Sequence, residues 1–264
     1  MRTKLLLLAL SITFGTANAQ DFKERKNKNR IYFSYGLNRT AYDLSTLQMK
    51  GEGYDFSLTH FDANDGFSEY DFGKFNGKLG FFLTENLSIS LGYDNFTYKN
   101  IDNRMVKING EIEGGSFGAN YEENQDVIRT SQDFLQYSYT KLSYINLNVE
   151  INDDFWVSKN GKLAWSYYFG LGGGILMSES EVLLFGKDQP ADAAPVTTNN
   201  GMNGFAGNAS FGTRMYLGPV FLDLGGKAGY MRSKEVQIDE KDGMADHTFV
   251  FVSGIASVGL SFRF

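Results

Sequence analysis

The last stretch of the chain, residues 248–264, constrains the fold more than any other part of the sequence. It reads TFVFVSGIASVGLSFRF and alternates by face up to the final carboxylate. Counted back in steps of two from Phe264, one face is apolar or small. The other is polar or small except in its upstream half, at Ile255, Phe251 and Phe249. A period of two over this length predicts a β-strand of roughly 55 Å, at about 3.3 Å per residue. Such a strand needs an apolar medium on one side and a polar one on the other.

Seven further stretches alternate in the same way and predict strands. They are 31–38, 73–83, 87–96, 141–151, 162–177, 205–217 and 220–231. Segments of this kind, separated by turn residues, are typical of transmembrane β-barrels. The sequence therefore predicts an all-β fold, a transmembrane antiparallel up-and-down β-barrel of eight strands. Ten strands are the alternative, because 49–60 and 103–112 could also span. The residues expected to face lipid include Leu79, Phe81, Ile89, Leu91, Leu171, Leu222, Val258 and Leu260.

The lengths of the connections predict which side of the membrane each one occupies. Bacterial barrels have short periplasmic turns and long extracellular loops. Both ends of the chain then lie in the periplasm, and Trp156 is expected at the membrane interface. Short turns are expected at 84–86, 152–161 and 218–219, and long polar loops at 39–71, 97–137, 179–203 and 232–247.

The N-terminal sequence predicts export. MRTKLLLLALSITFGTANAQ contains two basic residues, an apolar run and then Ala17-Asn18-Ala19, which is the pattern of a cleaved signal peptide. The apolar run is too short to cross a membrane as a helix. We expect residues 1–19 to be the signal peptide, 20–30 a periplasmic N-terminal tether and 31–264 the barrel domain. The expected location is the cell outer membrane.

Composition argues against other classes of protein. The chain has no cysteine, so neither a disulfide nor a lipidated cysteine can hold it. Its formal net charge of −6 argues against a nucleic-acid partner. A chain with 23 Phe and 15 Tyr is not intrinsically disordered. No cofactor is predicted. The expected partners are outer-membrane lipid and lipopolysaccharide, the barrel assembly machinery and an unidentified extracellular ligand.

Charged residues on the inward faces of the strands are expected to pair. Eight strands enclose an interior just wide enough for side chains to fill. An unpaired charge in such an interior is strongly destabilising, whereas a hydrogen-bonded pair offsets its own desolvation. We predict a structural plug of salt bridges, with a conducting lumen as the alternative. The inward set is Lys74, Lys78, Arg214, Lys227 and Arg263 against Asp94, Glu150 and Asp223, with Asn146, Asn148 and Asn208 between them.

Two groups of residues are candidates for a catalytic centre. Some small outer-membrane barrels are lipid A deacylases or acyltransferases that use His with Ser and an acid. The candidates here are His60 with Ser57 and Asp62, and His247 with Asp246. Histidine activates a serine only where the side chains meet, and residues three apart on a strand face opposite ways. The sequence also lacks a G-x-S-x-G motif. We therefore predict no catalytic residues and expect both histidines in loops.

A short acidic segment is a candidate cation site. Asp62, Asn64, Asp65 and Gly66 partly match a calcium-binding loop. The segment lacks a suitable ligand at the fifth position and an obvious Glu at the twelfth. We predict a solvated turn and no metal site.

Several stretches resemble a known family. They are KGEGYDFSLTHFDAND (50–65), NLSISLGYDNFTYK (86–99), VKINGEI (106–112) and YINLNVE (144–150). With the signal peptide and the aromatic terminus, they resemble outer-membrane β-barrel proteins of Gram-negative, Bacteroidetes-type bacteria, over nearly the whole mature chain. In such barrels a final Phe is the assembly signal, so the resemblance implies this role for Phe264. It implies no catalytic residues.

The expected function is that of a non-enzymatic outer-membrane protein. Its surface loops would serve binding, adhesion or envelope integrity. A lipid A hydrolase or acyltransferase and a small pore are the alternatives.

Overall fold

The computed structural model describes residues 27–61, 63–64, 74–123, 125–190, 193–238 and 243–263. The predicted signal peptide, residues 20–26 of the predicted tether and Phe264 lie outside these ranges, as do Asp62, Asp65 and Gly66. The predicted domain boundaries therefore stay predictions. Within the described ranges, no helix is long and apolar enough to cross a membrane.

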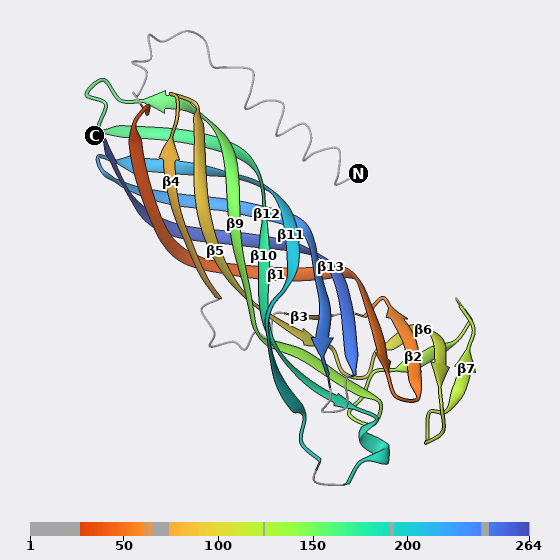
Figure 1. Ribbon diagram of the computed structural model, residues 1–264. Coiled ribbons are helices and arrows are strands. Elements are labelled where there is room, and N and C mark those ends of the chain that lie inside the picture. The colour runs from red at the N-terminus through yellow and green to blue at the C-terminus, as the bar shows by residue number, and fades with distance from the viewer. Residues whose placement is uncertain are drawn as a thin grey trace, which may run out of the picture.

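Long antiparallel strands pair side by side and close into a ring (Figure 1). The ring closes where the first strand pairs with the last, in a register that runs from Arg30 opposite Arg263 to Lys50 opposite Met244. The prediction of an eight-stranded antiparallel β-barrel is confirmed. In the order of pairing, the strands are β1 (Arg30–Gly51), β4 (Lys74–Phe82), β5 (Leu87–Asn100), β9 (Leu135–Val157), β10 (Leu163–Leu184), β11 (Val196–Leu217), β12 (Val220–Gln237) and β13 (Met244–Arg263).

The two stretches that could have made ten strands lie beside the ring. β2 (Tyr54–Thr59) pairs with the far part of β1, and β6 (Met105–Ile112) pairs with β2. Residues of β2 that point away from the core, such as Asp55, are polar and cannot face lipid. The ten-stranded alternative is therefore wrong. The remaining described elements are β3 (Ala63–Asn64), β7 (Ala119–Tyr121), β8 (Val127–Arg129) and the short 3₁₀ helix η1 (Gly186–Asp188).

Tight turns connect the strands at the end of the ring that holds Arg263. β11 and β12 are joined by Gly218-Pro219 alone, and Gly218 has a φ of 68°, which favours glycine. The turn expected at 152–161 is shorter than predicted, because β9 continues to Val157. Its acidic residues belong to the strand, where Asp153 accepts a hydrogen bond from Tyr167. The other two short turns lie where the sequence predicts them.

At the opposite end the strands continue far beyond their expected limits. The sequence predicts loops at residues 39–51, 179–184 and 232–237, which are strands instead. In this part the apolar residues point inward, as Leu47 and Met49 do, and the polar ones point out. Such strands can stand outside the membrane. We name as the outer extension the ring residues 39–51, 97–100, 135–140, 178–184, 196–204, 232–237 and 244–250, together with β2, β3, β6, β7, β8 and η1.

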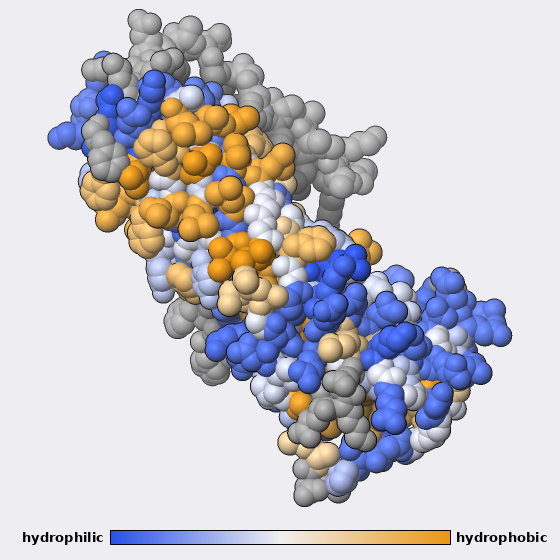
Figure 2. Space-filling model, in the orientation of Figure 1, coloured by the Kyte–Doolittle hydropathy of each residue, from blue (hydrophilic) through white to orange (hydrophobic). Residues whose placement is uncertain are grey.

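An apolar band surrounds the other half of the ring. Figure 2 shows hydrophobic side chains gathered over the part nearer the chain's C-terminal end, with hydrophilic surface over the outer extension. The eight residues expected to face lipid all lie on this outward face. Seven of them are 37–71% exposed, and Phe81 is half-buried between its neighbours. An exposed apolar band of this kind is stable against lipid and not against water.

Candidate functional site

A layer of paired charges fills the lumen inside the apolar band. Glu150 on β9 lies at its centre, because the period of two turns it inward between lipid-facing neighbours. Its carboxylate accepts hydrogen bonds from Lys78 Nζ at 2.6 Å, Arg214 Nη2 at 2.8 Å and the Tyr32 hydroxyl at 3.0 Å. Arg214 also donates from Nε to Asp223 at 3.0 Å. Four strands are tied together through this one carboxylate and its partners.

A second ion pair completes the layer. Lys227 Nζ lies 2.5 Å from Asp94, which also accepts hydrogen bonds from the amides of Asn76 and Asn146. The layer thus holds three cations and three anions. Each of these six residues is at most 9% exposed. The predicted plug of salt bridges matches this arrangement. Its confirmed charged members are Lys78, Arg214, Lys227, Asp94, Glu150 and Asp223, and Asn146, Asn148 and Asn208 lie among them.

Two predicted members of the plug are not among its fully buried charges. Arg263 is exposed, because it is the last residue of β13 and sits beyond the inward-facing Ser261, where the ring ends. Lys74 is half-buried at the first residue of β4. Arg263 therefore takes no part in the buried layer, and its predicted place in the plug is wrong.

An aromatic cluster closes the ring on the side of the tight turns. Tyr32, Phe82 and Phe221 are almost fully buried there with Tyr216. The Tyr32 and Phe82 ring centroids lie 5.5 Å apart. The Arg214 guanidinium carbon sits 4.8 Å from the Tyr32 ring, so the aromatic cluster and the charged layer are in direct contact.

His247 lies in the core of the outer extension. It is fully buried on β13, beyond Val252 and therefore outside the apolar band, and its neighbours on the opposite face are polar. Nε2 lies 2.9 Å from Ser45 Oγ and 3.1 Å from the Tyr98 hydroxyl, and Nδ1 lies 3.2 Å from the Tyr139 hydroxyl. Burial lowers the pKa of His247 to about 3. The expectation that His247 is a loop residue is wrong.

Among the described residues, no hydrogen bond joins the members of either candidate catalytic group. His60 is exposed with a φ of 61°, and Asp62 lies outside the described residues. Asp246 points away from His247 and lies 3.6 Å from Arg232. His247 meets Ser45 instead, a residue that sequence reasoning missed, because the pairing of β1 with β13 depends on the bulge between Asp43 and Thr46. The described residues hold no group of three or more His, Cys, Asp or Glu side chains that could bind a metal.

An open pocket lies on the surface of the outer extension. Its volume is about 590 Å³, within the range of small-molecule sites. Glu52 and Glu113 stand at its edge, where the Glu113 amide donates to the Gly53 carbonyl at 2.8 Å. We name it the outer pocket. Its lining residues are Glu52, Gly53, Tyr54, Glu113, Val182, Leu183, Leu184, Phe185, Gln189, Ala193, Ala194, Val196 and Ile238.

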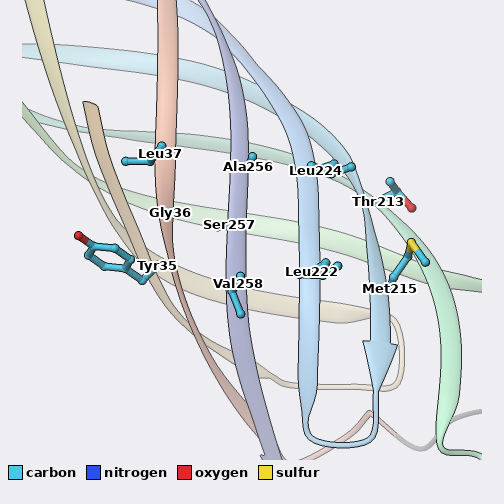
Figure 3. A pocket seen from close by; sticks show the side chains of 10 residues that line it. All are labelled: Tyr35, Gly36, Leu37, Thr213, Met215, Leu222, Leu224, Ala256, Ser257 and Val258. Carbon is cyan, nitrogen blue, oxygen red and sulfur yellow. The ribbon is translucent and has the colours of Figure 1, made fainter. Parts of the chain in front are cut away.

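A second hollow lies on the lipid-facing surface of the ring (Figure 3). Its volume is about 340 Å³, and it crosses β1, β13, β12 and β11. Tyr35 and Leu37 stand on one side, Leu222 and Met215 on the other, and the small side chain of Ala256 lies between them. The hollow is lined mainly by apolar side chains and lies within the apolar band, so it belongs to the lipid-facing surface.

No family model and no curated protein sequence matches the chain. Among solved structures, it is similar to the outer membrane protein AlkL in lipid bilayers, at 12% identity and a TM-score of 0.43, over 94% of this chain and 96% of that chain. It is similar to Ail, the attachment invasion locus protein of Yersinia pestis, at 11% identity and a TM-score of 0.33, over 89% and 99%. The outer membrane protein OprG from Pseudomonas aeruginosa has 8% identity and a TM-score of 0.34, over 92% and 100%. Likenesses this distant carry no argument about function.

The location follows from the molecule itself. A closed antiparallel ring leaves no unpaired strand edge in the bilayer, and the apolar band provides the lipid-facing surface. Tight turns at one end and long extensions at the other are the asymmetry of bacterial outer-membrane barrels. The protein is an outer-membrane β-barrel that contacts lipid in the cell outer membrane.

Proposed function

We propose that the protein is a non-enzymatic barrel that binds a ligand at the cell surface through its outer extension. The observation that supports this most is an open pocket above a filled lumen. The charged layer and the aromatic cluster occupy the ring, which argues against passage of a ligand through the barrel and supports binding at the outer pocket. The outer extension is a folded surface with its own hydrophobic core, which holds the pocket in shape.

Planar-bilayer recording tests the filled lumen. The purified barrel is expected to give no discrete conductance steps, because six charged side chains are paired across a ring that leaves little free width. A porin inserted in the same bilayers is the positive control. Reproducible steps from the wild-type protein would show a small pore and count against the proposal.

A lipid-modifying activity is the second candidate, and the contact between Ser45 and His247 favours it. Both residues are buried, and a histidine whose pKa is lowered to about 3 is a weak base. We therefore expect mass spectra of lipid A to be the same for cells with the wild-type protein, with Ser45→Ala and without the protein. A lipid A change that needs both the protein and Ser45 would establish the enzyme and overturn the non-enzymatic proposal.

Further partners belong to the proposal as well. Lipopolysaccharide would border the band at the outer leaflet, and the assembly machinery would recognise the C-terminal strand. Their support is the position of the band and the exposed Phe262 on β13. The finer resemblance, to Bacteroidetes-type barrels, rests only on the sequence stretches that carry it.

A further inference from the structure

The edge of the outer pocket is negatively charged. Glu52 lies in the turn between β1 and β2, and Glu113 follows β6, so the pairing of β2 with β6 brings the two together. A Cβ placed on Gly53 would lie 3.7 Å from the Glu113 Cβ and 3.9 Å from its Oε2, so Glu113 lies against this turn. Within the described part of the chain, neither carboxylate has a side-chain hydrogen bond or an ion pair. Both are free to meet a ligand.

Among the described residues that line the pocket, no basic side chain balances these carboxylates. Its described lining includes two glutamates and neither Lys nor Arg. The nearby Lys50 is already paired with Asp55, at 2.9 Å. The field in the pocket therefore favours a cation and disfavours an anion.

The floor of the outer pocket is apolar. Val182, Ile238 and Tyr54 are buried beneath it, and Leu184 and Phe185 pack on the same core. The Tyr54 and Phe185 rings meet edge to face with centroids 5.8 Å apart. A floor of this kind takes an aromatic or alkyl group, and the ring faces add to the attraction of a cation.

From this combination we propose that the outer pocket binds a small amphipathic cation. Its ammonium or guanidinium group would meet Glu52 and Glu113, and its apolar body would lie on the floor formed by Tyr54, Phe185 and Ile238. The inference rests on the proposed surface-binding function and specifies the class of ligand. The two carboxylates would select a positively charged ligand over a negatively charged one.

Tryptamine is a suitable probe, because it joins an indole to a primary ammonium. Its binding is measured by isothermal titration calorimetry at pH 7 to the barrel in phosphatidylcholine nanodiscs, with empty nanodiscs subtracted. Indole-3-propionate has a similar shape with the opposite charge and serves as the matched compound. The variant Glu52→Gln/Glu113→Gln removes both charges, and Glu111→Gln is the matched control, since Glu111 is exposed on β6 and does not line the pocket.

We expect saturable binding of tryptamine to the wild type and to Glu111→Gln, at least tenfold weaker binding to the double variant, and weaker binding at high salt. Indole-3-propionate should bind the wild type at least tenfold more weakly than tryptamine. Heat-dependent electrophoretic mobility checks that each variant is folded. Equal binding of the two compounds, or undiminished binding to the double variant, would refute charge selection and leave surface binding in place. Absence of tryptamine binding would also overturn the inference. The conductance measurement tests the closed lumen separately.

Discussion

Replacing Glu150 with Gln is expected to lower the free energy of unfolding of the barrel in lipid vesicles by about 3–5 kcal/mol. The substitution keeps the volume of the side chain and removes the charge that Lys78 and Arg214 share, at 2.6 and 2.8 Å. The two cations would then have only Asp223, which Arg214 already contacts. A buried cation without its counter-ion strongly raises the free energy of the folded state, because water cannot solvate it there.

A double substitution separates charge from packing. Glu150→Gln with Lys78→Gln leaves two cations and two anions in the layer, and this variant is expected to be more stable than Glu150→Gln alone. Urea unfolding in vesicles, followed by the fluorescence of Trp156 and Trp165, gives the free energies. Glu111→Gln on the outer extension should stay within about 0.5 kcal/mol of the wild type. A double variant no more stable than the single one would mean that the layer is held by shape and not by charge balance.

The ring and its charged layer follow from one property of the sequence. In the band, every second residue is apolar and its neighbours are polar, so both the strand and its facing can be counted from a single anchor such as Phe262. This count predicts that Glu150 points into the lumen. Because the ring is narrow, its buried carboxylate must pair with a cation. Arg263 belongs to the same inward set by this count. It is the last residue of β13 and is exposed where the ring ends, so it does not join the buried layer.

The sequence did not predict the outer extension, because there the apolar residues point into the core and the polar residues point outward. On β13, residues such as Val252 and Val258 point outward, whereas Phe249 and Phe251 point into the core. Strands are predicted where the outward residues are apolar. The outer extension has polar outward residues, so loops are predicted there. Bulges, such as that between Asp43 and Thr46, shift the count further. The outer pocket could not be predicted either, since it depends on how β2, β6 and β10 come together in space.

Acidification is expected to destabilise the barrel through His247. Its ring is enclosed by Ser45 on β1, Tyr98 on β5 and Tyr139 on β9, and its contacts in the described residues are hydroxyls and aromatic rings. Asp246 points to the other face, so none of the described carboxylates contacts the ring. Burial therefore lowers the pKa of His247 from its usual 6.5 to about 3 in the folded protein.

The sign of the effect follows from this difference in pKa. Between pH 6.5 and pH 3 the unfolded chain binds a proton at His247 that the folded protein excludes, so stability is present above pH 6.5 and is lost as the pH falls toward 3. The loss is about 2 kcal/mol at pH 5 and grows to about 5 kcal/mol near pH 3. At pH 5 and above, most carboxylates are still ionised, which isolates the contribution of the histidine.

His247→Gln tests this account, because the amide can keep hydrogen bonds to the surrounding hydroxyls and cannot be protonated in this range. The variant should be less stable than the wild type at pH 7.5, owing to the lost ring contacts, and should lose much less stability between pH 7.5 and pH 5. His60→Gln removes the other histidine, which is exposed, and should keep the wild-type dependence. Urea unfolding at pH 7.5, 6.5, 5.5 and 5 measures all three proteins. If His247→Gln weakens with acid as steeply as the wild type, the acid sensitivity lies in the charged layer of the lumen and not in the core of the outer extension.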